Sequence, residues 1–492
     1  MNPVLSLVVV AAAITCCHSA KPPHIVFIVA DDLGFGDLGY AKDSVMKTPH
    51  IDELAHEGVI LENYYVQPLC TPTRGAIMTG MYAIHTGKVE STAPRYLASY
   101  SLWTSFGSTD TATKIERSRN TGYVTHMVGK WHLGMYEWGY TPTYRGFDTY
   151  FGNYLERADH FTFLNRGILD LHDGEEPGVL DTTKESYSAH LYAERSVQVI
   201  KDHNASQPLF LYLPFLVTHQ PVQSPTYYSN IYKDEIKDDT RRTYAGMVSA
   251  MDEAIKNVTD ALKAKGIWND TLLIFTSDNG GIPHYGGYNY PLRGYKTQIW
   301  EGGFFLFVPK HHRPPAALGL KVDSKKLDGI NAWDTISSGA PSPRDEILIN
   351  IDLIGMPEKE GQPFFQTLGS ALRYKDWKLI QDAPDTEWFT PPELGGELRN
   401  GTGGLQNYTK MVKEALFNIT ADPEERKDLS QQFPDVVQNL RARLEVYKKS
   451  AVPALNVPQD PAAYKVAKEA GYWKPWKGKV SEQTHYFFVM KC

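Results

Sequence analysis

Four apolar runs in this chain end in side chains that can bind ions or transfer protons. The runs cover residues 25–30, 123–128, 209–213 and 272–276. The chemically active side chains that follow them are Asp31 and Asp32, Lys130 and His132, His219, and Asp278 and Asn279. Carboxylates suit metal binding, lysines suit anion binding, and imidazoles transfer protons near neutral pH. On residue types alone, a second interpretation stays open, in which these residues are polar loop caps after strands.

The apolar runs predict the strands that position these side chains. Runs without polar alternation are typical of strands buried on both faces of a mainly parallel sheet. Helical signals lie between the runs: Thr48 and Pro49 begin one helix that Gly58 ends, and 247–262 carries apolar residues at helical spacing before Gly266. This alternation predicts an α/β sandwich, in which ligands bind at the carboxyl ends of the strands.

The pattern changes beyond about residue 345. Residues 371–380 alternate like a hairpin, and residues 434–447 have one apolar helical face behind a proline. A chain of 492 residues is long enough for two domains. We expect a catalytic domain over residues 21–345 and a C-terminal α+β subdomain over residues 346–492, with a small antiparallel sheet and a helix.

The first 20 residues predict a secretory signal. The apolar stretch 4–14 is too short to span a bilayer, and the small residues Ser19 and Ala20 follow it. No later segment approaches 18 uninterrupted apolar residues, so we expect a chain without a membrane span, in the secretory pathway and then lysosomal or extracellular. Glycosylation sequons agree with this route; they begin at Asn204, Asn257, Asn269, Asn400, Asn407 and Asn418.

Composition limits the partners of the chain. Its hydrophobic content of 42% is that of a globular protein, and its net charge of −7 opposes a general polyanion-binding surface. No block rich in Lys and Arg indicates nucleic acid binding. An anionic substrate would therefore have to bind in a local basic pocket.

Cys70 begins the string CTPTRGAIMTG at residues 70–80. Cleavage of the signal would remove Cys16 and Cys17 and leave only Cys70 and Cys492. A disulfide between these two is one interpretation, since secreted chains favour pairing. The specificity of the string and the terminal position of Cys492 favour a chemical role for Cys70 instead.

The string resembles the signature of the sulfatase family, and further motifs extend the resemblance across most of the chain. It is similar to the arylsulfatase B-like branch, which contains N-acetylgalactosamine-4-sulfatase and its relatives. The other matching motifs are ADDLG at 30–34, GKWHLG at 129–134, RGFDTYFG at 145–152, DNGG at 278–281 and WEGG at 300–303. The resemblance implies an alkaline-phosphatase-like sandwich with a mainly parallel central sheet.

The resemblance also implies an activity, the hydrolysis of sulfate monoesters. The substrates would be aryl sulfates or a sulfated glycan such as glycosaminoglycan N-acetylgalactosamine 4-sulfate. Cys70 would be converted by the formylglycine-generating enzyme to formylglycine, whose hydrate is the nucleophile. One hydroxyl of the hydrate attacks sulfur, and the second allows collapse to the carbonyl and release of sulfate.

By the same resemblance, one Ca²⁺ ion is bound by Asp31, Asp32, Cys70, Asp278 and Asn279. Three carboxylates and an amide oxygen are hard ligands for a hard cation, and calcium tolerates irregular geometry. No cluster of Cys and His indicates zinc.

The resemblance assigns the remaining roles to five basic residues. Arg74 lies one helical turn after the cysteine and would stabilise the oxyanion of the nucleophile. Lys130 and Lys296 would contact the sulfate. His219 would protonate the departing alcohol, and His132 would take the proton of the second hydroxyl when sulfate leaves.

Two stretches depart from the family pattern. Residues 88–121 are polar where a leucine-rich helix is expected, and residues 304–326 are short by a couple of dozen residues. They support an alternative, a catalytically impaired secreted pseudoenzyme. A phosphohydrolase of the same superfamily is a second alternative, which Cys70 opposes because such enzymes place Ser or Thr there.

Overall fold

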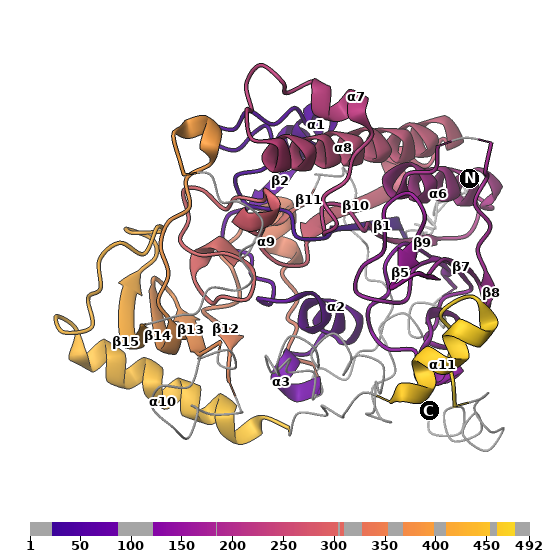
Figure 1. Cartoon of the computed structure of the whole chain (residues 1–492). Helices are drawn as coiled ribbons and strands as arrows, with labels where there is room; N and C mark the ends of the chain where they lie inside the picture. Colours follow the sequence, from indigo (N-terminus) through magenta and orange to yellow (C-terminus); the bar gives the residue numbers. More distant parts are fainter. Residues whose placement is uncertain are drawn as a thin grey trace, which may run out of the picture.

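The computed structural model describes most of the chain around one large and one small sheet (Figure 1). The described residues are 22–86, 122–183, 185–303, 306–308, 327–352, 368–397, 410–452 and 460–477. The predicted signal, most of the two atypical stretches, Cys492, and the sequons at Asn400 and Asn407 lie outside these residues. None of the helices in the described part of the chain is long and apolar enough to cross a membrane.

The large sheet has nine strands, and the five in its centre are parallel. From edge to edge the strands are β2 (Val59–Leu61), β11 (Leu306–Val308), β10 (Thr271–Ser277), β1 (His24–Ala30), β9 (Leu209–Pro214), β3 (Val124–Val128), β4 (Thr149–Gly152), β7 (His172–Asp173) and β8 (Glu176–Pro177). The four apolar runs form β10, β1, β9 and β3, which are neighbours in this order. The predicted α/β sandwich with a mainly parallel sheet is confirmed, with antiparallel pairings only towards its edges.

The register of the central strands brings their carboxyl ends to one level. Ala30, the last residue of β1, pairs with Ser277, the last residue of β10. Val29 pairs with Pro214 at the end of β9. The residues that follow these strands therefore emerge side by side at one edge of the sheet.

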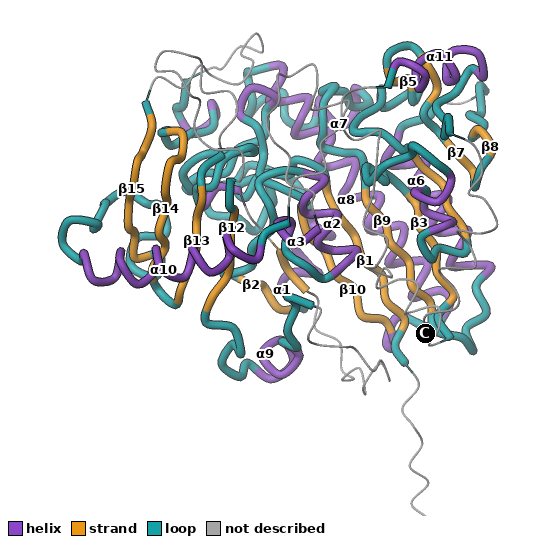
Figure 2. The backbone as a smooth tube through the Cα atoms, turned by 90° about the horizontal axis from the view of Figure 1, so that it is seen from below, coloured by secondary structure: helices purple, strands orange, loops and turns teal. Residues whose placement is uncertain are grey.

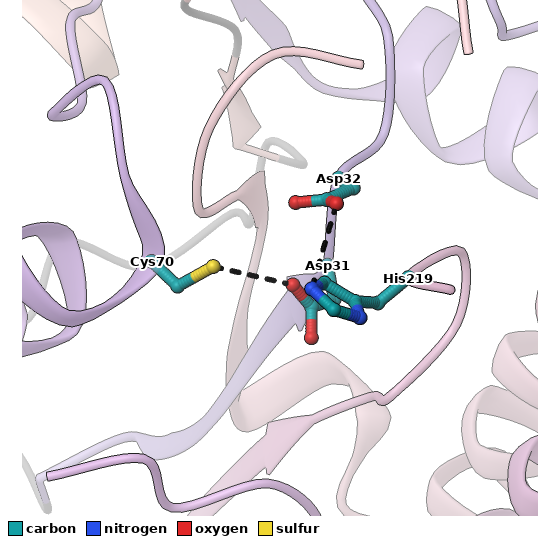
Figure 3. A group of neighbouring side chains, drawn as sticks. All are labelled: Asp31, Asp32, Cys70 and His219. Atoms are coloured by element: carbon teal, nitrogen blue, oxygen red, sulfur yellow. Dashed lines mark hydrogen bonds and ion pairs between the residues drawn. The ribbon is translucent and has the colours of Figure 1, made fainter. Parts of the chain in front are cut away.

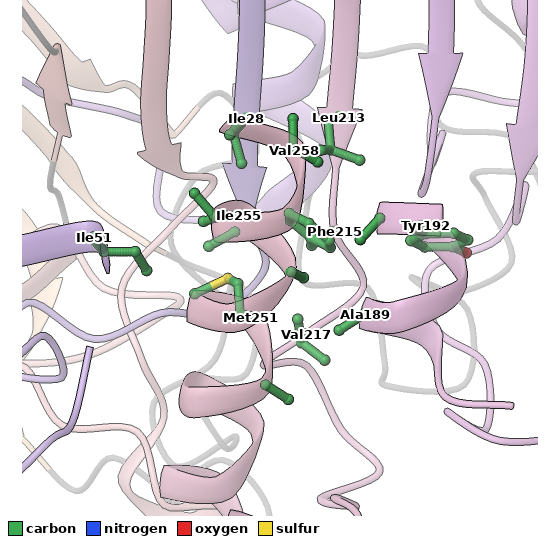
Figure 4. Close-up of a cluster of buried hydrophobic side chains, with 14 of the residues drawn as sticks. Ile28, Ile51, Ala189, Tyr192, Leu213, Phe215, Val217, Met251, Ile255 and Val258 are labelled. Atoms are coloured by element: carbon green, nitrogen blue, oxygen red, sulfur yellow. The ribbon is translucent and has the colours of Figure 1, made fainter. Parts of the chain in front are cut away.

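One face of the sheet is covered by four helices, shown together in Figure 1. They are α1 (Pro49–Glu57), α6 (Ser188–Asp202), α7 (Thr226–Asn230) and α8 (Asp239–Lys265). In Figure 4, Met251 and Ile255 of α8 lie below the strands among Ile28, Leu213 and other buried apolar side chains. The helices predicted at 49–57 and 247–262 are confirmed as α1 and as part of α8, which ends at Gly266 in the left-handed conformation.

The opposite face carries a second apolar cluster. The helices on this side are α2 (Cys70–Thr79), α3 (Ala83–Thr86) and α11 (Pro461–Ala470). Met78 of α2 packs with Val29 and Met127, and Ala463 and Ala467 of α11 join the same cluster. A segment near the carboxyl terminus thus packs against the large sheet.

The small sheet is antiparallel and stands beside the large one (Figure 2). Its strands are β12 (Glu346–Asn350), β13 (Ser370–Tyr374), β14 (Trp377–Pro384) and β15 (Met411–Asn418), and its helix is α10 (Pro434–Ser450). The predicted hairpin is β13–β14, and the predicted amphipathic helix is α10, which buries Val437, Leu440 and Leu444. The remaining elements are α9 (Trp333–Ser338), the hairpin β5 (Leu164–Asn165) and β6 (Ile168–Leu169), and 3-10 turns at Trp138–Tyr140, Pro142–Tyr144, Trp268–Asp270, Pro283–Tyr285, Glu301–Gly303 and Pro392–Leu394.

Candidate active site

Cys70 is the first residue of α2 and points into a buried cluster of charged groups (Figure 3). Its Sγ lies 3.1 Å from Lys296 Nζ and 3.7 Å from Asp31 Oδ1. The side chain is 4% exposed, and the cysteine forms no disulfide with any described residue. The partial positive charge of the α2 N-terminus adds to the positive field at this sulfur.

The thiol of Cys70 is poorly suited to act as a thiolate. Burial, followed by the charge of Asp278, raises the pKa of the Cys70 thiol well above its ordinary value. Lys130 and Lys296 oppose this rise without reversing it. Cysteine nucleophiles need a lowered pKa, because the thiolate is the attacking form.

The acidic residues predicted for the metal site converge at the ends of β1 and β10. The backbone N–H of Asp32 donates to Asp278 Oδ1 at 3.2 Å, and Asn279 Nδ2 donates to Asp32 Oδ1 at 2.7 Å. All these side chains, together with Asp31, are buried. Asp32 adopts a left-handed backbone with φ of 61°, which Asp tolerates better than most residues and which turns the chain sharply after β1.

Each of the three carboxylates has a cationic partner. Lys130 Nζ lies 2.5 Å from Asp31 Oδ2, and Lys296 Nζ lies 2.5 Å from Asp32 Oδ1. The guanidinium of Arg74 contacts the third, Asp278, through Nε and Nη2 at 3.0 and 2.7 Å. The sequence predicted that Arg74 would lie over the nucleophile and stabilise its oxyanion. In the described structure, Arg74 donates hydrogen bonds to Asp278 and to the Lys130 carbonyl.

The donor set of this cluster fits a hard cation. Burial, and then the charge of Asp278, raise the pKa of Asp31 to about 7. Burial also raises the pKa of Asp278, but Arg74 and Lys130 more than offset it, so that this pKa lies below its ordinary value. The Oδ1 atom of Asn279 is buried and accepts no hydrogen bond in the described structure. A divalent cation would satisfy this oxygen and relieve the repulsion between the carboxylates.

One group of neighbouring ligand atoms includes a residue for which the sequence predicted another role. Asp31, Asp32, Cys70 and His219 each offer one ligand atom, and these four atoms lie within 4.8 Å of one another. His219 was predicted as a proton donor and not as a ligand. In the structure, His219 lies beside the carboxylates that could hold a metal ion.

His132 lies in the loop after β3 with an unpartnered imidazole. The backbone N–H of His132 donates to the Tyr154 carbonyl oxygen at 3.1 Å, and the backbone carbonyl of His132 accepts from Thr71 Oγ1 at 3.1 Å. Both ring nitrogens are buried without a hydrogen-bond partner in the described structure. Burial, and then the charge of Lys130, lower the pKa of His132 well below its ordinary value. A neutral imidazole with a free nitrogen can accept a proton.

His219 presents its Nε2 atom to the carboxylates. Nδ1 lies 2.8 Å from the Gln220 carbonyl, and Nε2 lies 3.7 Å from Asp32 Oδ2. Because a carbonyl only accepts, Nδ1 carries a proton and the neutral ring has its lone pair on Nε2. Burial, and then the charge of Lys296, lower the pKa of His219 well below its ordinary value.

A glycine sets the position of the catalytic loop after β3. Gly129 has a φ of 130°, and a Cβ atom there would lie 1.9 Å from Pro214 O. The N–H of the next residue, Lys130, donates to that same oxygen at 2.8 Å. The tight approach brings Lys130 to the end of β9 and directs it towards the neighbouring strands.

Two residues that support the site, Tyr244 and Ser277, were not predicted from the sequence. The Tyr244 hydroxyl of α8 donates to the Asp32 carbonyl at 3.2 Å and accepts the N–H of Gly34. Ser277 Oγ donates to the Asn279 carbonyl at 2.6 Å. Ser277 directly precedes Asp278, so its position at the strand end was a signal, whereas Tyr244 sits in an ordinary helical pattern.

Comparison with known proteins identifies the family to which this chain belongs. A family profile described as Sulfatase matches residues 23–330, which is well over half of the chain. The chain belongs to the sulfatase family. The resemblance seen in its motifs is thereby confirmed, and the chain is a sulfuric ester hydrolase.

Similar sulfatases cover nearly the whole chain. Arylsulfatase J of Mus musculus is 40% identical to this chain, in an alignment that covers 92% of this chain and 80% of arylsulfatase J. N-acetylgalactosamine-6-sulfatase of Mus musculus is 27% identical, with 91% and 90% covered. The crystal structure of Ps i-CgsB in complex with k-i-k-neocarrahexaose superposes with a TM-score of 0.71 at 25% identity, covering 92% of this chain and 98% of that chain.

Proposed function

We propose that this sulfatase cleaves sulfate monoesters by means of a formylglycine made from Cys70 and a calcium ion bound at the ends of β1 and β10. One observation carries the proposal: Cys70 Sγ lies in a buried cluster, between Lys296 and Asp31. The neutral thiol supports conversion, because the unmodified side chain is a poor nucleophile there. A hydrated aldehyde at this position would supply one hydroxyl for attack on sulfur and a second for later release of sulfate.

Asp31, Asp32, Asp278 and Asn279 would hold the calcium ion, with the modified side chain at position 70 as a further ligand. The ion would supply Lewis-acid polarisation of a sulfate oxygen and of the attacking hydroxyl. The buried, unpartnered Oδ1 of Asn279 supports this ligand set.

The lysines can exchange one set of partners for another. Without a cation, Lys130 and Lys296 are the counter-ions of Asp31 and Asp32. Where a bound cation neutralises these carboxylates, the ammonium groups of Lys130 and Lys296 would be available to contact the sulfate oxygens. Arg74 keeps its two hydrogen bonds to Asp278 and so orients this ligand.

The histidines complete the proton transfers. Burial, and then the charges of Lys130 and Lys296, lower the pKa of His132 and of His219, and a bound sulfate would oppose the part that the lysines contribute. His219 then carries a proton on Nε2 and donates it to the departing alcohol oxygen. His132, with both ring nitrogens unpartnered, accepts the proton of the second hydroxyl as sulfate is released.

The substrate we propose is a sulfated small molecule or a sulfated glycan, including N-acetylgalactosamine 4-sulfate. Relatives are named for an N-acetylgalactosamine sulfate and for a steryl sulfate, and the similar crystal structure holds a neocarrahexaose. These names cover both classes of substrate, and the anion site would serve either.

Maturation in the secretory pathway follows from the same proposal. Residues 1–20 would be the signal, and the formylglycine-generating enzyme would act on Cys70 before delivery to lysosomes or to the extracellular space. The side chains of Asn204, Asn257 and Asn269 are exposed, as glycosylation of an asparagine requires. We retain 21–345 as the catalytic domain and 346–492 as the C-terminal subdomain.

Steady-state assays with an aryl sulfate and an aryl phosphate, with and without a chelator, test the proposal. We expect turnover of the sulfate only, and its loss on chelation. Preferential turnover of the phosphate would favour the phosphohydrolase alternative. The absence of both activities in protein that carries the aldehyde would favour an impaired enzyme.

A further inference from the structure

His160 is a buried histidine that joins the loop of His219 to helix α6. Its side chain is 0% exposed. Its Nε2 lies 2.9 Å from the His219 carbonyl oxygen, and its Nδ1 lies 2.7 Å from Ser188 Oγ. Ser188 is the first residue of α6, and its N–H also donates to the His160 carbonyl at 2.9 Å.

These contacts define a single tautomer of His160. The His219 carbonyl only accepts, so Nε2 of His160 carries the proton. Nδ1 then accepts the hydroxyl proton of Ser188. Burial lowers the pKa of His160 to about 4, so the ring stays neutral and keeps this arrangement across the working range of pH. The ring therefore holds a fixed direction between α6 and the His219 backbone.

A second group of bonds fixes the same two loops. The backbone N–H of His160 donates to Gln223 Oε1 at 3.0 Å, and Gln223 Nε2 donates to Asp159 Oδ2 at 2.7 Å. Tyr187 donates its hydroxyl to the Gln223 carbonyl at 2.9 Å. The segment between His219 and Gln223 is thus held at both ends by residues near position 160 or at the start of α6.

We propose that His160 is a positioning residue for the sulfatase reaction, which fixes the His219 backbone and so directs its imidazole at the leaving oxygen. This inference rests on the proposed role of His219. The carbonyl held by His160 belongs to the same residue as the imidazole, so a shift of this backbone moves Nε2. A displacement of about 1 Å in a catalytic group costs on the order of 100-fold in rate.

The test compares wild type, His160→Ala and His160→Gln with two aryl sulfates, one with a good leaving group (4-nitrophenyl sulfate) and one with a poor leaving group (phenyl sulfate). Only the poor leaving group needs protonation. We expect His160→Ala to lower kcat for phenyl sulfate at least about tenfold more than for 4-nitrophenyl sulfate, with a small change in KM. His160→Gln should restore part of the loss, because its amide N–H can donate to the carbonyl.

His203→Ala is the matched control. His203 caps the other end of α6 and also makes a ring contact to a loop carbonyl, with Nε2 2.9 Å from Gln207 O. We expect this variant to lower activity equally for both esters, if at all. Ser188→Ala removes one hydrogen bond to His160 without emptying its site, and should show a weaker form of the His160→Ala pattern even where that variant fails to fold.

Equal losses for both esters in His160→Ala, or no leaving-group dependence in Ser188→Ala if His160→Ala does not fold, would overturn the inference. The same leaving-group pattern in His203→Ala would also overturn it. A wild-type protein that carries the aldehyde and hydrolyses neither ester would instead contradict the proposed function, so the two failures are distinguishable.

Discussion

At the scale of residues, the site holds as many buried acids as buried cations. Asp31, Asp32 and Asp278 are paired with Lys130, Lys296 and Arg74, respectively. Burying such charges is costly unless each is paired and hydrogen-bonded. The six charged groups therefore compensate one another within the buried site.

Calcium should stabilise the folded protein more at pH 7.5 than at pH 5. Burial, and then the charge of Asp278, raise the pKa of Asp31 from its ordinary value of 3.8 to about 7. At a pH between 3.8 and about 7, Asp31 keeps its proton in the folded state but has lost it in the unfolded chain. Rising pH therefore lowers the free energy of unfolding of the protein without calcium. Calcium competes with that proton and binds better once it has gone. At 100 times the Kd, binding adds about 2.7 kcal/mol, measured as a shift in thermal unfolding.

The variant Asp278→Ala should lose the calcium response at both pH values. Asp252→Asn is the control, because Asp252 is also a buried carboxylate but accepts the N–H groups of His50 and Ile51 at the start of α1. It should keep the response. A calcium effect of equal size at both pH values would contradict the assignment of the proton to Asp31.

At the scale of elements, the strands are what the sequence predicts best. Continuous apolar runs identified β1, β3, β9 and β10, and parallel strands place their carboxyl ends at one edge, so the meeting of Asp31 with Asp278 was foreseeable. The helical periods of α1, α8 and α10 were equally clear. The burial pattern of a helix or strand depends on the residues of that element alone, so it can be predicted from the sequence.

Contacts between distant side chains were not foreseeable. Arg241 of α8 bonds Asp37 and Glu393, which lie 204 and 152 residues away in the chain. His160 joins His219 across 59 residues. A lone His or Arg carries no local signal of its partner, because the pairing is fixed only when the elements pack.

The ion pairs of Arg241 give a prediction about α8. Its Nη1 lies 2.7 Å from Asp37 Oδ1, and its Nη2 lies 2.7 Å from Glu393 Oε1. Replacing Arg241 by Met would leave two buried carboxylates without a cation, so we expect a loss of about 3–5 kcal/mol in the free energy of unfolding. Chemical denaturation measures this loss.

Lys256→Met on the same helix is the control for Arg241→Met. Lys256 pairs with Asp260 on the exposed surface, where an ion pair adds little to stability. It should unfold at nearly the same denaturant concentration as the wild type. Equal effects of the two substitutions would show that the buried ion pairs do not hold α8 in place.

At the scale of the whole molecule, a buried ionic contact joins the small sheet to the segment that follows Lys296. Lys378 of β14 lies 2.8 Å from Glu301 and 2.8 Å from Glu425, and its side chain is fully buried. Glu301 follows Trp300, whose ring packs with Phe417 of β15. The small sheet is therefore joined to the loop that follows Lys296 and shares a core with it.

A cavity lies beside strand β11, which is the described part of the short stretch at 304–326. A cavity of about 750 Å³ lies between β2, α2 and α9. Apolar residues that line it are Ile60, Tyr64, Ile77, Met81, Ile336 and Ile347. β11 pairs with β2 at the edge of this cavity, and the next described residue after Val308 is Leu327.

We predict that the corresponding segment of a sulfatase in which this segment is longer, grafted in place of residues 309–326, raises the melting temperature and lowers the binding of a hydrophobic dye. Each 100 Å² of apolar surface that the graft buries would contribute about 2.5 kcal/mol. A Gly/Ser segment of the same length is the control and should not stabilise. If the graft and the control leave stability and aryl sulfatase activity unchanged, the short stretch is tolerated and the impaired-enzyme alternative loses its main support.

Peptide mass spectrometry tests most directly whether the nucleophile derives from Cys70, as we propose. Active protein secreted from eukaryotic cells would be digested and the peptide containing residue 70 analysed, with Cys70→Ser as the control that the modifying enzyme for cysteine should leave unchanged. We predict an aldehyde in place of the thiol in the wild type, and neither aldehyde nor turnover in Cys70→Ser. An unmodified thiol at position 70 in fully active enzyme would contradict the account.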